Sequence, residues 1–364
     1  MTRLHQLAEL KQSIWLDYIN RSLIESGALK KWIDDGLRGM TSNPSIFNQV
    51  ISQGSDYDPK ILKLKEAGKS TFEIYDELTI RDIQDACDLF EPVYKTTRGF
   101  DGYVSLEINP ELADDTGASI TEGRRLFKTV NRPNVMIKVP ATQAGFPVIE
   151  ELLSDGINVN VTLIFSLKQY DDTARAFLKG LERLSRKTND LSAIASVASV
   201  FVSRVDSVVD DMLDKKNLSA LKGKAAVANC KLILERSREL FSGPVFKALA
   251  GKGAKIQRVL WGSTSTKNPA YSDVKYVAEL IAPDTVNTVP EKTLKAFMDH
   301  GTVQAALLGD ARDAQEIVKS LRAAGIDLDD ICRKLLDDGV AAFEKAFVEL
   351  MQSLKTKASQ LCSR

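Results

Sequence analysis

The sequence has few of the residues on which many catalytic and metal sites depend. Only two histidines, His5 and His300, occur in 364 residues, which argues against a histidine-centred triad or a multi-histidine metal site. Four cysteines are widely spaced and form no C-x-x-C pair: Cys87, Cys230, Cys332 and Cys362. Neither a zinc site nor a disulfide framework is therefore predicted. Acid and base chemistry must depend on carboxylates, lysine or tyrosine.

Net charge and long apolar runs are also missing. The 49 basic and 49 acidic residues cancel, so no excess charge favours nucleic acid or a membrane surface as a partner. Any bound anion should be small and held locally. No run of about 18 apolar residues occurs, and the first ten residues lack the apolar core of a secretory signal. We therefore expect a cytoplasmic protein.

One lysine lies within an apolar segment where a solvated charge is out of place. Residues 135–139 read Val-Met-Ile-Lys-Val, the pattern of a strand buried on both faces, and Pro140 closes the segment. Lys138 thus lies near the carboxyl end of a buried strand. A lysine attacks a carbonyl near neutral pH when burial or nearby charge lowers its pKa from about 10.4 toward roughly 7 to 8. The alternative is a lysine paired with a buried carboxylate.

Seven further short apolar segments accompany the Lys138 strand, and helical patterns separate them. The eight predicted strands are 14–18, 36–42, 102–108, 135–139, 157–165, 196–203, 256–261 and 285–290. The predicted helices are 3–13, 22–34, 59–64, 71–90, 120–130, 146–154, 166–187, 204–215, 220–240 and 272–281. This alternation is typical of a closed (β/α)8 barrel, an α/β fold whose site lies at the carboxyl ends of the strands.

A doubly wound open sheet is the alternative architecture. The segment after the first strand, residues 17–20, contains no glycine, so the dinucleotide-binding turn of that fold is missing. We predict one domain over residues 1–364, with the barrel at about 12–302 and a carboxyl-terminal helical arm at about 303–357. An apolar stripe on the arm, from Ile331 to Met351, predicts core packing, a dimer contact or a cover over the barrel mouth. The polar end, 355–364, is expected to fray.

Polar side chains cluster where the predicted strands end. They are Asp17, Thr41, Asn43, Glu107, Asn160, Thr162 and Ser199. Together with Lys138, they form a set that suits Schiff-base chemistry, in which the lysine attacks a ketone and the iminium acts as an electron sink for carbon–carbon cleavage. One carboxylate would move the proton of the substrate hydroxyl, and a second, with a hydroxyl and a water, would assist loss of water.

Each of these residues also has an ordinary structural explanation. Asp17 caps a turn in that interpretation, Asn43 sets the turn before Pro44, and Glu107 pairs with a surface lysine. Their joint occurrence at strand ends favours the catalytic interpretation.

A second group of residues suggests a phosphate site. Arg204 follows the sixth predicted strand, and the loop 262–267 after the seventh supplies hydroxyls, amide N–H groups and Lys267. Cations and N–H donors suit a phosphate, which barrels of this type often bind late in the strand order. The alternative is that residues 263–266 form an ordinary polar loop that binds no ligand.

Several motifs resemble those of the transaldolase family, in the same order along the chain. They are RGMTSNPSIF at 38–47, SLEINP at 105–110, NVMIKVPAT at 134–142, NVNVTLIFS at 158–166, SVFVSRVD at 199–206 and WGSTSTKNPAYSD at 261–273. The last of these loops looks most like one branch of the family. The resemblance covers nearly the whole chain from residue 17 to residue 290.

The resemblance implies a role for each matching position. Lys138 forms the imine, Asp17 is the acid/base in bond cleavage, and Glu107 acts through a water with Thr162. The implied substrate-binding residues are Thr41, Asn43, Asn160 and Ser199 near the dihydroxyacetone part, Phe201, and Arg204, Ser265 and Lys267 at the phosphate. Lys267 departs from the family pattern, because other branches carry arginine there, and a point charge replaces a bidentate fork.

The implied activity is transfer of a dihydroxyacetone unit from sedoheptulose 7-phosphate to glyceraldehyde 3-phosphate in the pentose phosphate pathway, without a metal or organic cofactor. Sugar phosphates are the expected partners, and either a monomer or a homodimer is compatible with the sequence. The alternatives are a fructose 6-phosphate aldolase that releases free dihydroxyacetone and a non-catalytic phosphosugar-binding barrel. Phe201 favours transfer, because related releasing aldolases resemble this chain but carry tyrosine at that position.

Overall fold

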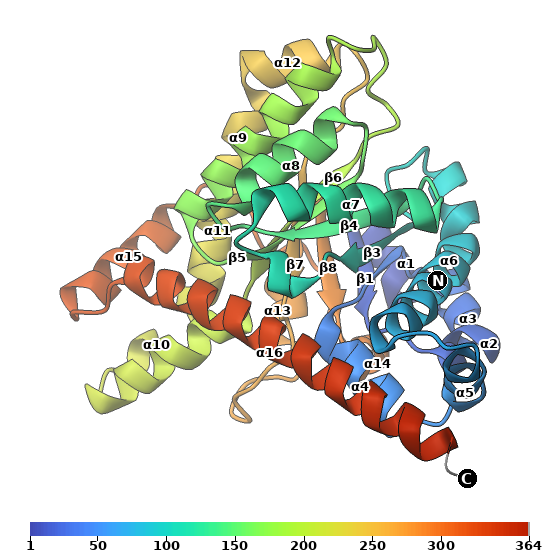
Figure 1. Cartoon of the computed structure of the whole chain (residues 1–364). Helices are drawn as coiled ribbons and strands as arrows, with labels where there is room; N and C mark the ends of the chain where they lie inside the picture. The colour runs from blue at the N-terminus through green and yellow to red at the C-terminus, as the bar shows by residue number, and fades with distance from the viewer. Residues whose placement is uncertain (363–364) are drawn as a thin grey trace.

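The computed structural model describes residues 1–362, and eight parallel strands among them form a closed barrel in chain order (Figure 1). The (β/α)8 prediction is confirmed. The strands are β1 (Gln12–Asp17), β2 (Gly39–Thr41), β3 (Tyr103–Glu107), β4 (Val135–Pro140), β5 (Val159–Ile164), β6 (Ser196–Phe201), β7 (Arg258–Gly262) and β8 (Thr285–Val289). The last strand pairs with the first, which closes the sheet without an edge.

The register of the strands brings polar residues to one level of the barrel. Glu107 pairs with Lys138 across β3 and β4, and Lys138 pairs with Asn160 across β4 and β5. All residues of β4 are buried, as the apolar run around Lys138 predicts. The polar residues near the ends of three neighbouring strands therefore lie side by side.

Helices surround the barrel and account for most of the remaining chain (Figure 1). They are α1 (Arg3–Glu9), α2 (Arg21–Glu25), α3 (Ala28–Asp34), α4 (Pro44–Gln53), α5 (Asp58–Glu66), α6 (Thr71–Thr96), α7 (Thr116–Val130), α8 (Gly145–Ser154), α9 (Leu167–Leu184), α10 (Ser203–Lys215), α11 (Ala225–Ser242), α12 (Pro244–Ala250), α13 (Lys275–Ala278), α14 (Glu291–His300), α15 (Arg312–Ala323) and α16 (Leu328–Cys362). Two 3-10 turns, Pro110–Leu112 and Ser219–Leu221, complete the assignment.

Several predicted helix boundaries are wrong, and backbone conformation explains two of them. The helix predicted at 3–13 ends at Glu9, because Lys11 has a left-handed φ of 60° and leads directly into β1. The helix predicted at 22–34 is two helices, separated at Gly27 with φ of 79°. The helix predicted at 272–281 is only the short α13. Helices α4 and α12 were not predicted, and each begins at a proline, which suits the first helical turn.

The long carboxyl-terminal helix α16 lies across the barrel rather than beside it. In Figure 1 it runs as a single red helix from near α15 and α10 to α4 and α5. It contacts α4, α5, α6 and also β5, so one helix joins opposite sides of the barrel. The apolar stripe predicted from Ile331 to Met351 belongs to this helix, and part of it is buried. The division of the chain into a barrel and an arm at residue 303 stays a prediction.

The expected fraying of the chain end is wrong as far as Cys362. Helix α16 continues to that residue, and Lys357 holds it to the last turn of α4 and the start of α5. The Lys357 ammonium donates to the Ile51 carbonyl at 2.9 Å and lies 2.6 Å from a carboxylate oxygen of Asp58. Residues 363–364 of the predicted segment lie outside the described part. Within the described residues, no helix combines the length and apolar character needed to cross a membrane.

Candidate active site

Lys138 is buried in the barrel and makes two polar contacts. Only 5% of the residue is exposed, and its Nζ donates to the Ser42 carbonyl at 3.0 Å and to Glu107 Oε2 at 3.2 Å. The expectation that Glu107 pairs with a surface lysine is wrong, since its partner is Lys138 inside the barrel. The pairing of Lys138 with a buried carboxylate, which was the structural alternative, is present. This pairing also supplies a proton acceptor next to the amine.

A cavity of about 210 Å³ opens beside Lys138 at the carboxyl ends of the strands. Ten residues predicted for the site line it: Asp17, Thr41, Asn43, Lys138, Thr162, Ser199, Phe201, Arg204, Ser265 and Lys267. The structure thus gathers side chains from six strands or the loops that follow them. Glu107 and Asn160 do not line this cavity and act from behind it.

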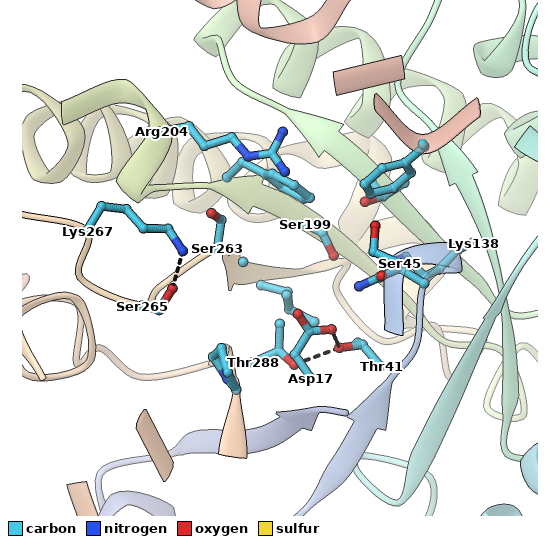
Figure 2. A pocket seen from close by; sticks show the side chains of 17 residues that line it. Asp17, Thr41, Ser45, Lys138, Ser199, Arg204, Ser263, Ser265, Lys267 and Thr288 are labelled. Carbon is cyan, nitrogen blue, oxygen red and sulfur yellow. Dashed lines mark hydrogen bonds between the residues drawn. The ribbon is translucent and has the colours of Figure 1, made fainter. Parts of the chain in front are cut away.

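Asp17 lies at the end of β1 with its carboxylate inside the cavity (Figure 2). Thr41 Oγ1 donates to Asp17 Oδ1 at 2.7 Å and lies 2.8 Å from the hydroxyl of Thr288. Burial raises the pKa of Asp17, whereas the charge of Lys138 and the bond from Thr41 lower it, with burial the largest effect. Asp17 is therefore predisposed to take up a proton.

Glu107 experiences the same opposing influences on the other side of the lysine. Burial raises its pKa, and the positive charge of Lys138 and their hydrogen bond lower it. Two carboxyls with raised pKa values thus share one ammonium group. Pairs of this kind occur at sites that carry out acid and base catalysis.

Asn160 and Thr162 follow each other on β5 but have different surroundings. Asn160 Nδ2 donates to Ser105 Oγ at 2.9 Å, and Asn160 Oδ1 accepts from Ser199 Oγ at 2.6 Å. Asn160 therefore fixes the Ser199 hydroxyl at the cavity wall. The buried Thr162 Oγ1 has no hydrogen-bond partner among the described residues, although it belongs to a cavity-lining residue. That hydroxyl is available to a substrate or a water.

The other end of the cavity is cationic. Figure 2 shows Arg204, Ser263, Ser265 and Lys267 together, on the side opposite Lys138. Lys267 Nζ donates to Ser265 Oγ at 2.7 Å, and within the described residues no carboxylate influences the pKa of Arg204 or Lys267. Burial lowers the pKa of both cations, and the charge of Arg204 further lowers the pKa of Lys267. Two such cations facing each other favour an anionic ligand.

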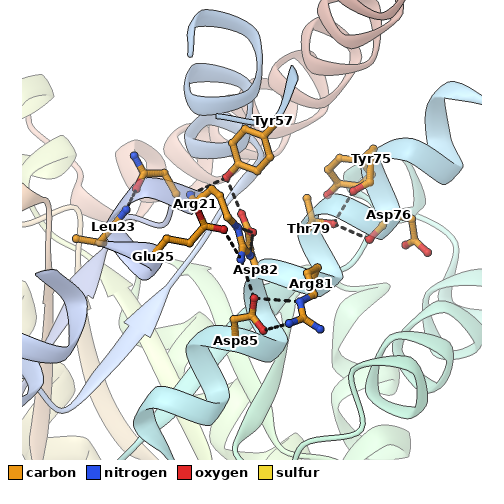
Figure 3. Close-up of polar contacts among 11 residues, drawn as sticks. Arg21, Leu23, Glu25, Tyr57, Tyr75, Asp76, Thr79, Arg81, Asp82 and Asp85 are labelled. Carbon is orange, nitrogen blue, oxygen red and sulfur yellow. Dashed lines mark hydrogen bonds and ion pairs between the residues drawn. The ribbon is translucent and has the colours of Figure 1, made fainter. Parts of the chain in front are cut away.

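A buried polar cluster fixes the segment that follows Asp17 (Figure 3). Arg21, on α2, donates through Nε to Asp82 Oδ1 at 2.9 Å and through Nη1 to Asp85 Oδ2 at 2.7 Å. Tyr57 donates to Asp82 at 2.6 Å, and its oxygen accepts from the Arg21 N–H at 3.1 Å. The cluster ties α2 to α6 and holds the backbone just beyond β1 in place.

Comparison with known proteins agrees with this geometry. The family model described as Transaldolase/Fructose-6-phosphate aldolase matches residues 14–354. The chain belongs to this family. A transaldolase from Trichodesmium erythraeum (strain IMS101) is 44% identical over 98% of this chain and 97% of its own length. Transaldolases from Saccharopolyspora erythraea and Mycobacterium ulcerans are 46% and 43% identical over 99% and 96% of this chain, covering 98% and 95% of their own lengths.

This member of the transaldolase/fructose-6-phosphate aldolase family has cavity residues that sequence reasoning missed. They are Ser45, Leu260, Thr288, Pro290 and Phe343, whereas Gly262 and Ser263 belong to the loop that was predicted to bind phosphate. Thr288 lies at the end of β8, and its position in a strand-end pattern was a usable signal. Phe343 had no such signal, because it comes from α16, far along the chain from the barrel strands. Among the described residues, no cluster of histidine, cysteine, aspartate or glutamate could hold a metal.

Proposed function

We propose that this protein is a transaldolase that moves a dihydroxyacetone unit from a ketose phosphate, such as sedoheptulose 7-phosphate, to glyceraldehyde 3-phosphate through a Schiff base on Lys138. The observation that supports this most strongly is one cavity with the Lys138 amine and the Asp17 carboxylate at one end and the cations of Arg204 and Lys267 at the other. The family and the names of the relatives support it independently. The products are then erythrose 4-phosphate and fructose 6-phosphate.

The first half of the reaction forms the imine. The Lys138 amine, freed of its proton by Glu107 at 3.2 Å, attacks the ketone carbon and gives a carbinolamine. The carbinolamine hydroxyl leaves as water after protonation. In this proposal Glu107 holds the water involved together with the Thr162 hydroxyl, which has no hydrogen-bond partner among the described residues. The product is a positively charged iminium that draws electrons from the neighbouring carbon–carbon bond.

Asp17 carries out the cleavage step. Its carboxylate takes the proton of the hydroxyl on the fourth carbon, the bond between the third and fourth carbons breaks, and an aldose phosphate leaves. The electron pair of that bond becomes the enamine on Lys138. The acceptor aldehyde is then attacked by the enamine, Asp17 returns its proton to the new alkoxide, and hydrolysis of the imine frees the product and the lysine.

The cavity has separate places for the two parts of the substrate. Asn43 and Ser199 would contact the dihydroxyacetone part close to Lys138, and Asn160 would hold the Ser199 hydroxyl in place from behind the cavity wall. Arg204, Ser265 and Lys267 would hold the phosphate. Asn43 Oδ1 caps α4 by accepting from the Ile46 N–H at 3.1 Å, which leaves its amide nitrogen for the substrate. Phe201 also lines the cavity, with its ring 5.3 Å from Arg204 Cζ.

Mass spectrometry after borohydride reduction tests the central step and provides our first prediction. With fructose 6-phosphate present, reduction should leave a stable three-carbon adduct on the peptide containing Lys138. Lys138→Met should show no adduct and no transfer while its circular dichroism stays unchanged. An unmodified wild-type protein would support a non-catalytic phosphosugar-binding barrel. Accumulation of free dihydroxyacetone at the rate of fructose 6-phosphate consumption would instead support the releasing aldolase.

A further inference from the structure

Two hydroxyl groups in series lead from β8 to the carboxylate of Asp17 (Figure 2). Thr41 Oγ1 donates to Asp17 Oδ1 at 2.7 Å, and the Thr288 hydroxyl lies 2.8 Å from the same Thr41 oxygen. Thr41 and Thr288 are 2% and 4% exposed, so little solvent competes for these bonds. Within the described residues, Thr288 Oγ1 has no hydrogen-bond partner other than Thr41. The hydrogen bonding of the Thr288 hydroxyl therefore depends on Thr41 alone.

The direction of these bonds follows from the number of protons. A hydroxyl has one proton to donate and accepts on its two lone pairs. The ionised Asp17 carboxylate can only accept, so Thr41 gives its proton to Asp17, and Thr288 must be the donor to Thr41. Thr288 thus occupies a lone pair of Thr41 and keeps the Thr41 proton directed at Asp17. Hydrogen bonds that follow one another in this way strengthen each other.

Strand pairing places these residues next to one another. Asp17 pairs with Thr41 across β1 and β2. Thr288 pairs with Trp15, two residues before Asp17 and on the same face of β1. The Thr264 hydroxyl donates to the Thr288 carbonyl at 2.9 Å, which holds the end of β8. The branched Cβ of threonine also restricts χ1, so strand register and rotamer together fix the Thr288 hydroxyl.

The bond from Thr41 is one of three influences on the pKa of Asp17. Burial raises this pKa most strongly, and the positive charge of Lys138 on β4 and the hydrogen bond from Thr41 lower it. The charge of Asp17 in turn raises the pKa of Glu107 on β3. The remaining charged residues that line the cavity, at its other end, are Arg204 and Lys267. A weaker bond from Thr41 would therefore leave the pKa of Asp17 higher.

From this arrangement we propose that Thr288 is a positioning residue for the cleavage step, which holds the Thr41 hydroxyl as a donor to Asp17 while Asp17 accepts the substrate proton. The proposal rests on the function proposed above. Thr41 occupies Oδ1 of Asp17, which leaves Oδ2 to accept that proton. In the proposed function, imine formation at Lys138 depends on Glu107. Loss of the Thr288 hydroxyl should therefore slow cleavage and not imine formation.

Rapid quenching of the full-length protein with borohydride separates the two steps. Fructose 6-phosphate is the substrate, and the Lys138 peptide is analysed by mass spectrometry at times shorter than one turnover. A six-carbon adduct reports the imine before cleavage, and a three-carbon adduct reports cleavage. Thr288→Val should form total adduct at the wild-type rate but three-carbon adduct about 2- to 10-fold more slowly, as expected for one neutral hydrogen bond. Thr288→Ala should show the same selective slowing, and Thr288→Ser, which keeps the hydroxyl, should behave like wild type.

The pH profile of transfer is the second measurement. Asp17 must be ionised to accept the proton, so activity falls as pH drops through its pKa. Because a weaker bond from Thr41 raises that pKa, the acid side of the kcat profile should move to higher pH in Thr288→Val. Thr285→Val is the matched control, since Thr285 lies on the same strand and donates to the Ala282 carbonyl, away from the cavity. It should lower stability without moving the pH profile or the ratio of the two adducts.

A double-mutant cycle with Thr41→Val shows whether Thr288 acts through Thr41. Thr288→Val should slow cleavage in the wild-type protein and have no further effect in Thr41→Val. Equal slowing in both proteins, with a raised KM, would mean that Thr288 contacts the substrate directly and would overturn the proposal. A wild-type rate of cleavage in Thr288→Val would also overturn it. Absence of any adduct in the wild-type protein would instead refute the proposed function itself.

Discussion

Asp17 and Glu107 come from different strands and share the charge of Lys138, yet burial dominates the pKa of each. Both carboxyls therefore bind a proton more readily in the folded protein than in the unfolded chain. For an acid/base group this is useful, because its pKa moves toward the working pH. For the stability of the fold it is a cost at neutral pH.

The pH dependence of stability should reveal that cost at Asp17. The unfolded carboxyl has a pKa of about 3.9, and the folded one is higher, so the folded state holds more protons between the two values. Stability therefore falls as pH rises through this window and the loss is complete above the folded pKa. Asp17→Asn should be more stable than wild type at pH 7.5, and the difference should shrink as pH approaches about 4.

Urea unfolding at several pH values between about 4.5 and 8 measures the difference in stability between Asp17→Asn and the wild type. Asp114→Asn is a suitable control, since Asp114 is an exposed loop residue. A stability difference for Asp17→Asn that grows toward acid pH would contradict the raised pKa. The same variant should be nearly inactive in transfer, because an amide cannot take up the hydroxyl proton.

Lys267 offers a second prediction at the scale of one side chain. With Arg204 nearby and no paired carboxylate among the described residues, its ammonium is free to contact a substrate phosphate. Lys267→Ala should raise KM for phosphorylated substrates by about 10- to 100-fold, as expected for a lost charged hydrogen bond. The value of kcat should change little, because the phosphate lies away from the reacting carbons.

Lys267→Arg is the informative comparison for steady-state kinetics. An arginine can hold a phosphate with two hydrogen bonds, so KM should stay near the wild-type value or fall. Unchanged KM in Lys267→Ala would remove Lys267 from the phosphate site and leave Arg204 and the loop N–H groups to bind the anion.

At the scale of elements, the end of β2 and the start of α4 show how one segment serves both fold and site. Asn43 and Pro44 were interpreted as a turn, and they are instead the cap and first residue of α4. Proline at the first helical position loses no hydrogen bond, and the Asn43 side chain satisfies the Ile46 N–H. The new helix brings Ser45 into the cavity, which a simple turn would not have suggested.

The anchor at the end of α16 gives a prediction about this helix. Lys357 is largely buried and contacts the Ile51 carbonyl and the Asp58 carboxylate. Lys357→Ala should lower the free energy of unfolding by about 1.5 to 3 kcal/mol, the usual range for hydrogen bonds to a charged group. Denaturant unfolding measures the loss, and Lys355→Ala, at an exposed position of the same helix, should be nearly neutral. Equal losses of stability in both variants would mean that a change in helix propensity, and not the loss of the Lys357 contacts, causes the effect.

For the whole molecule, a second buried ion pair closes the barrel at the end away from the site. Arg258, on β7, donates to Asp101 Oδ1 at 2.8 Å and to Ser13 Oγ at 2.8 Å, and Ser13 donates to Asp101 Oδ2 at 2.7 Å. The Phe100 ring lies 4.0 Å from Arg258 Cζ. The network joins β1, β7 and the segment before β3, which are distant in sequence.

Breaking this pair should destabilise the barrel as a unit. Asp101→Ala leaves the Arg258 charge buried without its partner, which costs about 3 to 5 kcal/mol. Thermal or urea unfolding measures the loss. The double variant Asp101→Leu/Arg258→Met, with both charges removed, should recover most of it. A double variant as unstable as Asp101→Ala would mean that packing around the network, and not the unpaired charge, accounts for the loss.

Local patterns in the sequence were enough to predict the barrel and most of the residues that line the cavity. Strand periodicity and burial are local properties, so the alternation of strands and helices was visible along the chain. Because parallel strands end at one face, the polar residues that follow them could be assigned to one cavity in advance. Asp17, Lys138 and Arg204 were found in this way, and the cavity contains all three.

Two features required the folded structure: which residues from outside the strand pattern line the cavity, and which side chains form pairs. The pairing of Glu107 with Lys138 depends on the register between β3 and β4. Phe343 reaches Lys138 because α16 crosses the barrel. An apolar stripe on a helix does not indicate which surface of the protein the helix will pack against. Long-range packing sets such contacts, and it is a property of the folded chain and not of any local segment.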